Sequence, residues 1–135
     1  MEKGYLQVYT GNGKGKTTAA LGLTIRAAGA GLKVFIAQFI KAGDYSEIKA
    51  LQRFSDLVII NQYGLGRFIK GKPSLEDIDA ATMGLTAVRA AISSEKYDVV
   101  IMEEANVAVT CGLFSVENLL EIIKNRPESV FCQRF

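Results

Sequence analysis

TGNGKGKTT, at residues 10–18, is the stretch that decides the fold predicted for this chain. It follows a predicted strand that begins at Tyr5 and leads at once into a predicted helix at residues 16–28, which is rich in small side chains. In such a strand–loop–helix unit, glycines let backbone N–H groups turn inward around phosphate oxygens, and the helix N-terminus adds a partial positive charge. The stretch therefore predicts a nucleotide-binding loop, which we expect to hold the triphosphate of ATP together with magnesium.

Two side chains of this loop carry its predicted chemistry. Lys16 adds a mobile positive charge to the phosphate cavity, and the hydroxyl of Thr17 is placed to coordinate Mg²⁺. The Walker A pattern GxxxxGK[ST] has glycine where this chain has Thr10, and Gly11 follows one position later. A glycine-rich turn that only caps a helix is the alternative interpretation. We expect phosphate binding along the whole loop, by Gly11, Asn12, Gly13, Lys14, Gly15, Lys16, Thr17 and Thr18.

A second predicted element of the site is acidic. Glu103 and Glu104 follow directly after a buried-strand pattern at residues 98–102. Ligands of open α/β sheets bind at the carboxyl ends of the strands, and an acidic residue there holds the magnesium ion or its waters. We therefore expect a Mg²⁺ site formed by Thr17, Glu103 and Glu104, and the sequence does not choose between the two glutamates. A solvated acidic turn is the other interpretation.

Strand patterns alternate with helical periods along the rest of the chain. Strands are predicted at residues 5–10, 33–39, 57–61, 98–102 and 129–135. A long helix is predicted to start at Ser74, which has capping-box spacing to Asp77. A last helix from Ser115 is predicted to bury Val116, Leu119, Leu120 and Ile123. The order predicts one domain, residues 1–135, with an α/β fold: a three-layer, P-loop NTPase-like (RecA-like), mostly parallel sheet with helices on both faces.

The composition favours a protein that binds small ligands. The chain has 135 residues, a net charge of +2 and no long run of like charges, so we expect binding neither to nucleic acid nor to a membrane. Cys111 and Cys132 are too few for a disulfide framework, and we recognise no signal or membrane-spanning pattern, which predicts a cytoplasmic protein with free thiols. Histidine is absent, so the commonest general base near neutral pH is missing.

Further motifs, taken together with the loop, resemble a known family nearly from end to end: the ATP:corrinoid adenosyltransferases of the P-loop type. The resemblance rests on residues 10–20, on QFIK at 38–41, on Glu103-Glu104 with Asn106, and on NRPE at 125–128. The family shares the shifted glycine of the loop. Its members attach adenosine to the cobalt of cobalamin and related corrinoids.

The resemblance implies a reaction in which cobalt(I) of a corrinoid, cobalamin or cobinamide, attacks the 5′ carbon of ATP and releases the whole triphosphate. Cobalt(I) carries no proton, which would explain the missing general base. The catalytic residues implied are Lys16, Thr17 and Glu104. Further cofactor-binding residues implied are Lys14, Lys41, Arg134 and, on the corrinoid side, Phe68 within residues 63–69. The resemblance also implies a flavoprotein-type reductant that supplies cobalt(I), a homodimer, and a member shortened at its C-terminus.

Two other functions stay open at this stage. The loop and the acidic strand end would equally serve γ-phosphoryl transfer, as in a small-molecule kinase or an ATPase, which predicts ADP from ATP. A relative without catalytic activity that binds ATP or a corrinoid would instead show binding without turnover.

Overall fold

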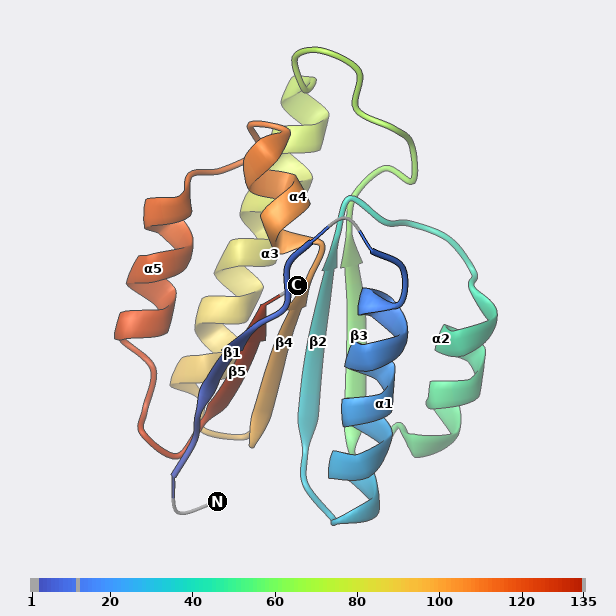
Figure 1. Cartoon of the computed structure of the whole chain (residues 1–135), viewed down its shortest axis with the longest axis vertical. Helices are drawn as coiled ribbons and strands as arrows, with labels where there is room; N and C mark the ends of the chain where they lie inside the picture. Colours follow the sequence, from blue (N-terminus) through green and yellow to red (C-terminus); the bar gives the residue numbers. More distant parts are fainter. Residues whose placement is uncertain (1–2, 12, 135) are drawn as a thin grey trace.

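The structure of the chain is a computed structural model that describes residues 3–11 and 13–134, with side chains described as far as Val130. Its five described strands form one parallel sheet in the order β1-β5-β4-β2-β3 (Figure 1). Their bounds are β1 (Leu6–Val8), β2 (Val34–Phe39), β3 (Val58–Tyr63), β4 (Val99–Glu103) and β5 (Phe131–Arg134). The strand runs predicted from the sequence are thus all present, within a few residues of the predicted bounds.

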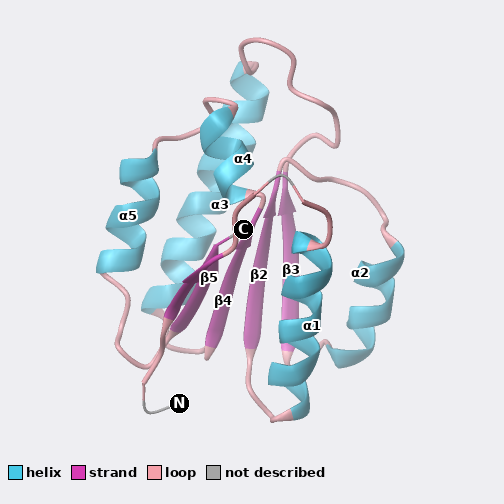
Figure 2. Cartoon of the chain, in the orientation of Figure 1, coloured by secondary structure: helices cyan, strands magenta, loops and turns pink. Residues whose placement is uncertain are grey.

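Helices cover both faces of this sheet, so the fold has three layers (Figure 2). The helical elements are α1 (Lys16–Gly29), α2 (Ser46–Leu51), the short 3-10 helix η1 (Gln52–Phe54), α3 (Leu75–Ser93), α4 (Ala105–Thr110) and α5 (Val116–Lys124). Figure 1 shows α1 and α2 on one face and α3, α4 and α5 on the other. The predicted α/β class, P-loop NTPase-like with a parallel sheet, is confirmed.

Strands β2 and β4 form the centre of the core because every residue of both is buried. Alternate side chains of a strand point to opposite faces, so each strand serves two hydrophobic clusters. On the α1 face, Ile36 and Ile101 pack against Ala20 of the helix. On the other face, Phe39 and Met102 belong to the cluster that α3, α4 and α5 cover. Apolar burial on both faces fixes the register that later positions the site.

The long helix α3 starts as its sequence predicts. Ser74 is the N-cap, and its hydroxyl accepts a hydrogen bond from the backbone N–H of Asp77 at 3.1 Å, while the Asp77 carboxylate accepts from the Ser74 backbone N–H at 2.9 Å. Ala81, Leu85, Val88 and Ile92 are buried along its sheet-facing side. Close contact with the sheet also needs Gly84, since a Cβ there would lie 2.5 Å from the Phe39 ring.

The predicted burial of α5 is partly wrong. Leu119 and Ile123 are buried as expected, but Val116 is 40% exposed and Leu120 is 42% exposed. The buried face of the helix also includes Ile122, which was not among the residues predicted to be buried. The reason is the phase of the helix: Leu119, Ile122 and Ile123 share one face at spacings of three and four residues, whereas Val116 and Leu120 flank it.

Three short helical elements, α2, η1 and α4, were not predicted from the sequence. Helices α2 and α4 have six residues each and η1 has three, which is less than two helical turns and too short to show a helical period. The N-cap residues of α2 and α4, Tyr45 and Glu104, are not among the preferred Ser, Thr, Asp and Asn, and neither makes a side-chain cap.

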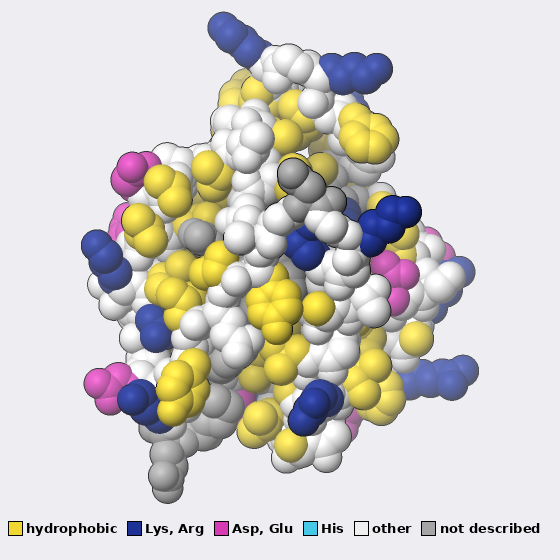
Figure 3. All heavy atoms as spheres, viewed as in Figure 1, with side chains coloured by type: hydrophobic (Ala, Val, Ile, Leu, Met, Phe, Trp, Pro, Cys, Tyr) yellow, Lys and Arg dark blue, Asp and Glu magenta, His cyan; other side chains and the backbone are white. Residues whose placement is uncertain are grey.

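The β1 edge of the sheet differs from its centre. Leu6 is 40% exposed and Val8 is 43% exposed, unlike the buried residues of β2 and β4. On the α1 face, no described helix covers the sheet over β1. Figure 3 shows hydrophobic atoms on this face between β1 and α1. Among the described residues, no helix is both long and apolar enough to cross a bilayer.

Candidate active site

The loop predicted to bind phosphates joins β1 to α1 at the carboxyl end of the sheet. Gly11 has φ 128° and Gly15, the N-cap of α1, has φ 100°, both in the left-handed region that favours glycine. The ammonium group of Lys16 donates hydrogen bonds to the carbonyl oxygens of Gly11 at 2.7 Å and Gly13 at 2.9 Å. The loop is therefore curled around the lysine that the sequence assigns to the phosphates.

A row of three polar side chains crosses the sheet beside this loop. Parallel pairing aligns Gln38 of β2 with Gln62 of β3 on one side and with Glu103 of β4 on the other. The side chains follow the same alignment: Gln62 donates to Gln38 Oε1 at 3.2 Å, and Gln38 donates to Glu103 Oε2 at 2.5 Å. Gln38 and Glu103 are almost completely buried. Gln38 and Glu103 lie two residues after Ile36 and Ile101 on their strands, so their side chains point to the same face as α1. Glu103 therefore lies next to the first turn of this helix.

Glu103 is the point at which the loop, the sheet and a lysine meet. Its Oε1 accepts hydrogen bonds from the hydroxyl of Thr17 and from the ammonium group of Lys41, the latter at 2.7 Å. Lys41 also donates to Thr17 Oγ1 at 3.2 Å. The side chain of Glu103 is 1% exposed and that of Lys41 is 23% exposed. Burying a carboxylate is costly unless it is paired and hydrogen-bonded, and here both oxygens have partners.

The backbone that carries Lys41 is braced by the next loop. Ile40 follows β2 with φ 70°, an unfavourable conformation for a β-branched residue. Gly64 packs against it so closely that a Cβ would lie 2.1 Å from the Ile40 carbonyl carbon. The backbone N–H of Gly66 donates to the Ile40 carbonyl at 3.3 Å. Only glycine at position 64 permits this contact, which ties the position of Lys41 to residues 64–66.

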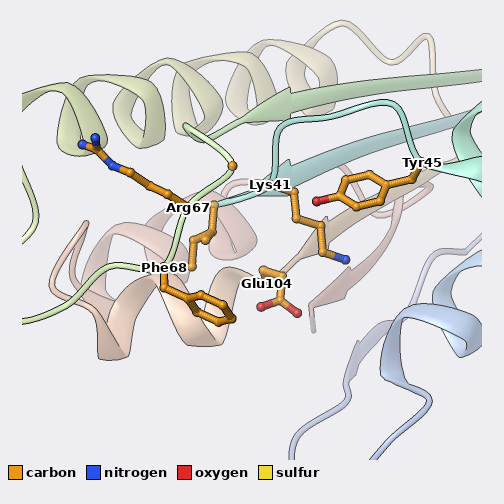
Figure 4. Close-up of a pocket in the computed structure, with 7 residues that line it drawn as sticks. Lys41, Tyr45, Arg67, Phe68 and Glu104 are labelled. Carbon is orange, nitrogen blue, oxygen red and sulfur yellow. The ribbon is translucent and has the colours of Figure 1, made fainter.

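Glu104 lies between two cavities. A cavity of about 330 Å³ on the loop side is lined by Gly11, Lys16, Glu104 and Asn106, among others. A second cavity, of about 280 Å³, is lined by Ile40, Lys41, Tyr45, Gly66, Arg67, Phe68 and Glu104. Figure 4 shows Lys41, Tyr45, Phe68 and Glu104 around this second cavity, whereas the Arg67 side chain points away from it. Glu104 has φ 62°, and residues held in this strained region cluster at functional sites.

Residues 64–72 form an exposed loop over the second cavity. Phe68 is 94% exposed. Arg67 anchors the loop to the start of α3: its guanidinium donates to Ser74 Oγ at 3.1 Å and lies 3.6 Å from the Asp77 carboxylate. Hydrogen bonds from the Ser74 backbone and hydroxyl, with the nearby Arg67 charge, hold the pKa of Asp77 below its ordinary value of 3.8 against a smaller opposing effect of burial.

The structure brings together most of the residues predicted for the site. Thr17 and Glu103 are in direct contact, and Lys16, Lys41 and Glu104 line the adjoining cavities. Gly13, Lys14 and Thr18 belong to the same loop and the first turn of α1, where all three are exposed. Phe68 is placed at the second cavity but not against the loop. Asn12 and the side chain of Arg134 lie outside the described residues.

Two residues of the site were not predicted from the sequence. Gln38 belongs to the motif QFIK but was not assigned to the site, and Gln62 was not mentioned at all. A signal for Gln38 was present: it is the one polar residue in the strand VFIAQF, and a polar group at a fully buried position needs a partner. Gln62 had no such signal, because β3 is only partly buried and its polar residues look like ordinary edge residues.

The oxygen atoms of Thr17 and Glu103 are suitable ligands for a magnesium ion bound together with a nucleotide. Mg²⁺ prefers oxygen ligands and is usually held by one or two carboxylates together with substrate phosphates and waters. Thr17 Oγ1 and Glu103 Oε1 supply a hydroxyl and a carboxylate beside the phosphate loop. Within the described part of the chain, no three His, Cys, Asp or Glu side chains group together as a metal site. Nucleotide phosphates and waters usually supply the other ligands of such an ion.

The fold and the loop define this chain as an α/β domain of the P-loop NTPase type. Residues 2–132 match the model of the family described as ATP:corrinoid adenosyltransferase BtuR/CobO/CobP. The chain belongs to this family.

Curated relatives agree with the family match. The chain is 32% identical over 127 residues to the corrinoid adenosyltransferase of Pseudomonas aeruginosa, an alignment that covers 93% of this chain and 63% of the relative. It is 30% identical over 127 residues to the corrinoid adenosyltransferase of Escherichia coli, covering 93% and 64% of the two chains. A stretch of 40 residues is 60% identical to the corrinoid adenosyltransferase CobA of Salmonella typhimurium, 30% of this chain and 20% of that one. The chain thus spans a little under two thirds of the length of the first two relatives.

Proposed function

We propose that this protein transfers the 5′-deoxyadenosyl group of ATP to the cobalt(I) of a corrinoid and releases triphosphate. The observation that carries the proposal is the pair of cavities that share Glu104. One is lined by the phosphate loop and the other by Lys41 and Phe68. Two substrates bound in adjoining cavities can be brought into contact, which is the main requirement of a transfer between them.

The phosphate half of the site suits the charge that develops in this reaction. The bond between the 5′ carbon and its phosphate oxygen breaks, and the leaving triphosphate gains negative charge. Lys16, the loop N–H groups and the N-terminus of α1 are the groups we assign to that charge. Thr17 and Glu103 would hold Mg²⁺, which when bound would neutralise part of the same charge.

The reaction needs no proton transfer, and the residues agree with that. Cobalt(I) supplies the electron pair of the new cobalt–carbon bond, and the triphosphate leaves with the electron pair of the broken carbon–oxygen bond. The chain contains no histidine, and its titratable groups around the second cavity are Lys41, Tyr45, Arg67 and Glu104. We assign to them the tasks of orienting the substrates and excluding water rather than that of a general base.

The second cavity is the proposed corrinoid side. An exposed aromatic ring such as Phe68 can pack against the flat face of a macrocycle, and its loop is tethered to α3 through Arg67. Cobalamin and cobinamide are both candidates. Arg134 and Lys14 are proposed as further contacts of ATP. A flavoprotein-type reductant, a homodimer and a cytoplasmic location complete the proposal.

An anaerobic assay tests this function. ATP, Mg²⁺ and chemically reduced cobalamin are mixed with the protein, and the loss of the cobalt(I) spectrum is followed together with a light-sensitive adenosyl product and free triphosphate. Product and triphosphate in equal amounts are expected. ADP release without a corrinoid would instead indicate a kinase or ATPase, and ATP binding without any product would indicate a relative without catalytic activity.

A further inference from the structure

We propose that the ammonium group of Lys41 is a built-in counter-cation that occupies the magnesium position of the nucleotide-free site and moves to the triphosphate when Mg²⁺ and ATP bind together. This inference rests on the proposed function only as far as ATP and Mg²⁺ binding. It assigns to Lys41 a role beyond that of a further phosphate contact: the lysine couples the two ligands to each other.

The geometry places a positive charge against the two oxygen atoms assigned to the metal, which are hydrogen-bonded to each other. Lys41 Nζ lies 2.7 Å from Glu103 Oε1 and 3.2 Å from Thr17 Oγ1. These are the same two atoms that would coordinate Mg²⁺ beside the phosphate loop. An ammonium group and a metal ion cannot both take this place, so the lysine must leave before the ion enters.

Burial makes this exchange unfavourable for the metal alone. The Glu103 side chain is 1% exposed, and its pairing with Lys41 offsets the cost of holding a buried charge. Mg²⁺ without nucleotide would displace Lys41, whose side chain is 23% exposed, from Glu103, the carboxylate with which it is paired. When ATP arrives with the ion, the triphosphate supplies a new negative partner for the displaced lysine. Lys41 thus has Glu103 as its partner in the free site and the triphosphate in the loaded site. Because each ligand favours the same loaded state, the binding of Mg²⁺ and the binding of ATP are coupled.

The surroundings hold the rest of the site in place during such an exchange. Glu103 stays fixed through Gln38, which donates to its other oxygen at 2.5 Å and is itself held by Gln62. The backbone of residue 41 is braced by the contact of Gly64 with Ile40. Lys41 can change partner by moving its side chain alone, since lysine carries its charge at the end of a flexible four-carbon stem.

The test measures metal binding to the nucleotide-free protein, with Mn²⁺ as the probe and free Mn²⁺ followed by its paramagnetic resonance signal. We expect weak binding by the wild type and affinity about tenfold or more higher in Lys41→Met. Lys49→Met, which removes an exposed lysine paired with Asp44, is the matched control and should behave as the wild type. Lys41→Gln, which can still donate a hydrogen bond to Glu103, should show the same gain and serves if Lys41→Met does not fold.

Two further results decide the assignment. The gained affinity must disappear in the double variant Lys41→Met/Glu103→Gln, because the bound ion is assigned to Glu103. Mg²⁺ alone should raise the thermal unfolding midpoint of Lys41→Met and leave that of the wild type unchanged. Equal Mn²⁺ affinity in wild type and both Lys41 variants would overturn the proposal, as would a gain that persists in the double variant. No corrinoid is present, so failure of adenosyl transfer would leave this result unaffected.

Discussion

The two halves of the site are built in opposite ways. In the phosphate half, Glu103 and Gln38 are almost completely buried, and both carboxylate oxygens of Glu103, the proposed metal ligand, have hydrogen-bonded partners. In the other half, Phe68 is 94% exposed on a loop that is held by the Arg67 side chain and by a backbone hydrogen bond from Gly66 to Ile40. A preorganised site loses little entropy when its ligand binds, whereas an exposed loop must be ordered at the expense of binding energy.

The difference implies separate tasks for the halves. The buried half has one arrangement of charges, which suits a triphosphate of fixed shape and charge. The exposed half can adapt to a large partner, and its ring gains most when that partner covers it. Loss of a group that holds ATP or Mg²⁺ in the phosphate half should therefore reduce affinity more than a substitution in the loop does.

Lys16→Ala should have the largest effect. It removes the charge around which the loop is curled, and we expect ATP affinity to fall roughly 100-fold or more. Isothermal titration with Mg²⁺ and ATP measures this. Lys33→Ala is the control, because it removes an exposed lysine just before β2, at the opposite end of the sheet. Equal ATP affinity in Lys16→Ala and the wild type would refute the phosphate-loop assignment.

Glu103→Gln should have the second largest effect, and it tests which of the two glutamates, Glu103 or Glu104, binds the metal ion. The change removes the carboxylate shared by Thr17 and Lys41, so the Mg²⁺ concentration needed for ATP binding should rise roughly 10- to 100-fold. Glu104→Gln, one residue away and facing the cavities, should leave that concentration unchanged and lower turnover instead. ATP titrations at several Mg²⁺ concentrations compare the variants, and the reverse pattern would assign the metal to Glu104.

These two halves also differ in how far the sequence reveals them. The loop at residues 10–18 and the cap at Ser74 are local patterns, so the sequence predicts them closely. The row of Gln62, Gln38 and Glu103 depends on strand order and register between residues far apart in the chain. Because alternate residues of a strand share a face, the sequence could have predicted that Glu103 lies on the same face as Ile101. The sequence does not show which helix covers that face.

Phe68→Ala should have a moderate effect confined to the corrinoid. An exposed ring that packs only when its partner is bound should contribute roughly tenfold to the apparent corrinoid affinity, with ATP affinity unchanged. Steady-state kinetics with cobalamin and cobinamide, together with ATP titration, measures both. Phe54→Ala is a matched control, since that ring is 44% exposed and belongs to η1. A loss of ATP affinity in Phe68→Ala would contradict the separation of the two halves.

Asp77→Asn should have the smallest effect, on stability alone, because Asp77 supports the loop only through Ser74 and Arg67. The pKa of Asp77 is lowered in the folded protein, so the folded state favours the ionised carboxylate more than the unfolded chain does. Its contribution is present above the unfolded value of 3.8 and is lost as the pH falls through the lower folded value.

Thermal unfolding from pH 7 to pH 3 measures this contribution. The wild type should be more stable than Asp77→Asn at pH 7, and the gap should narrow as the pH falls below 3.8, whereas the exposed Asp79→Asn should show no such gap. A gap that stays constant to pH 3 would mean that the charge of Asp77 does not stabilise the helix start. If the gap narrows while Asp77→Asn keeps the ATP affinity of the wild type, the loop anchor and the phosphate half are energetically independent, as their separate construction predicts.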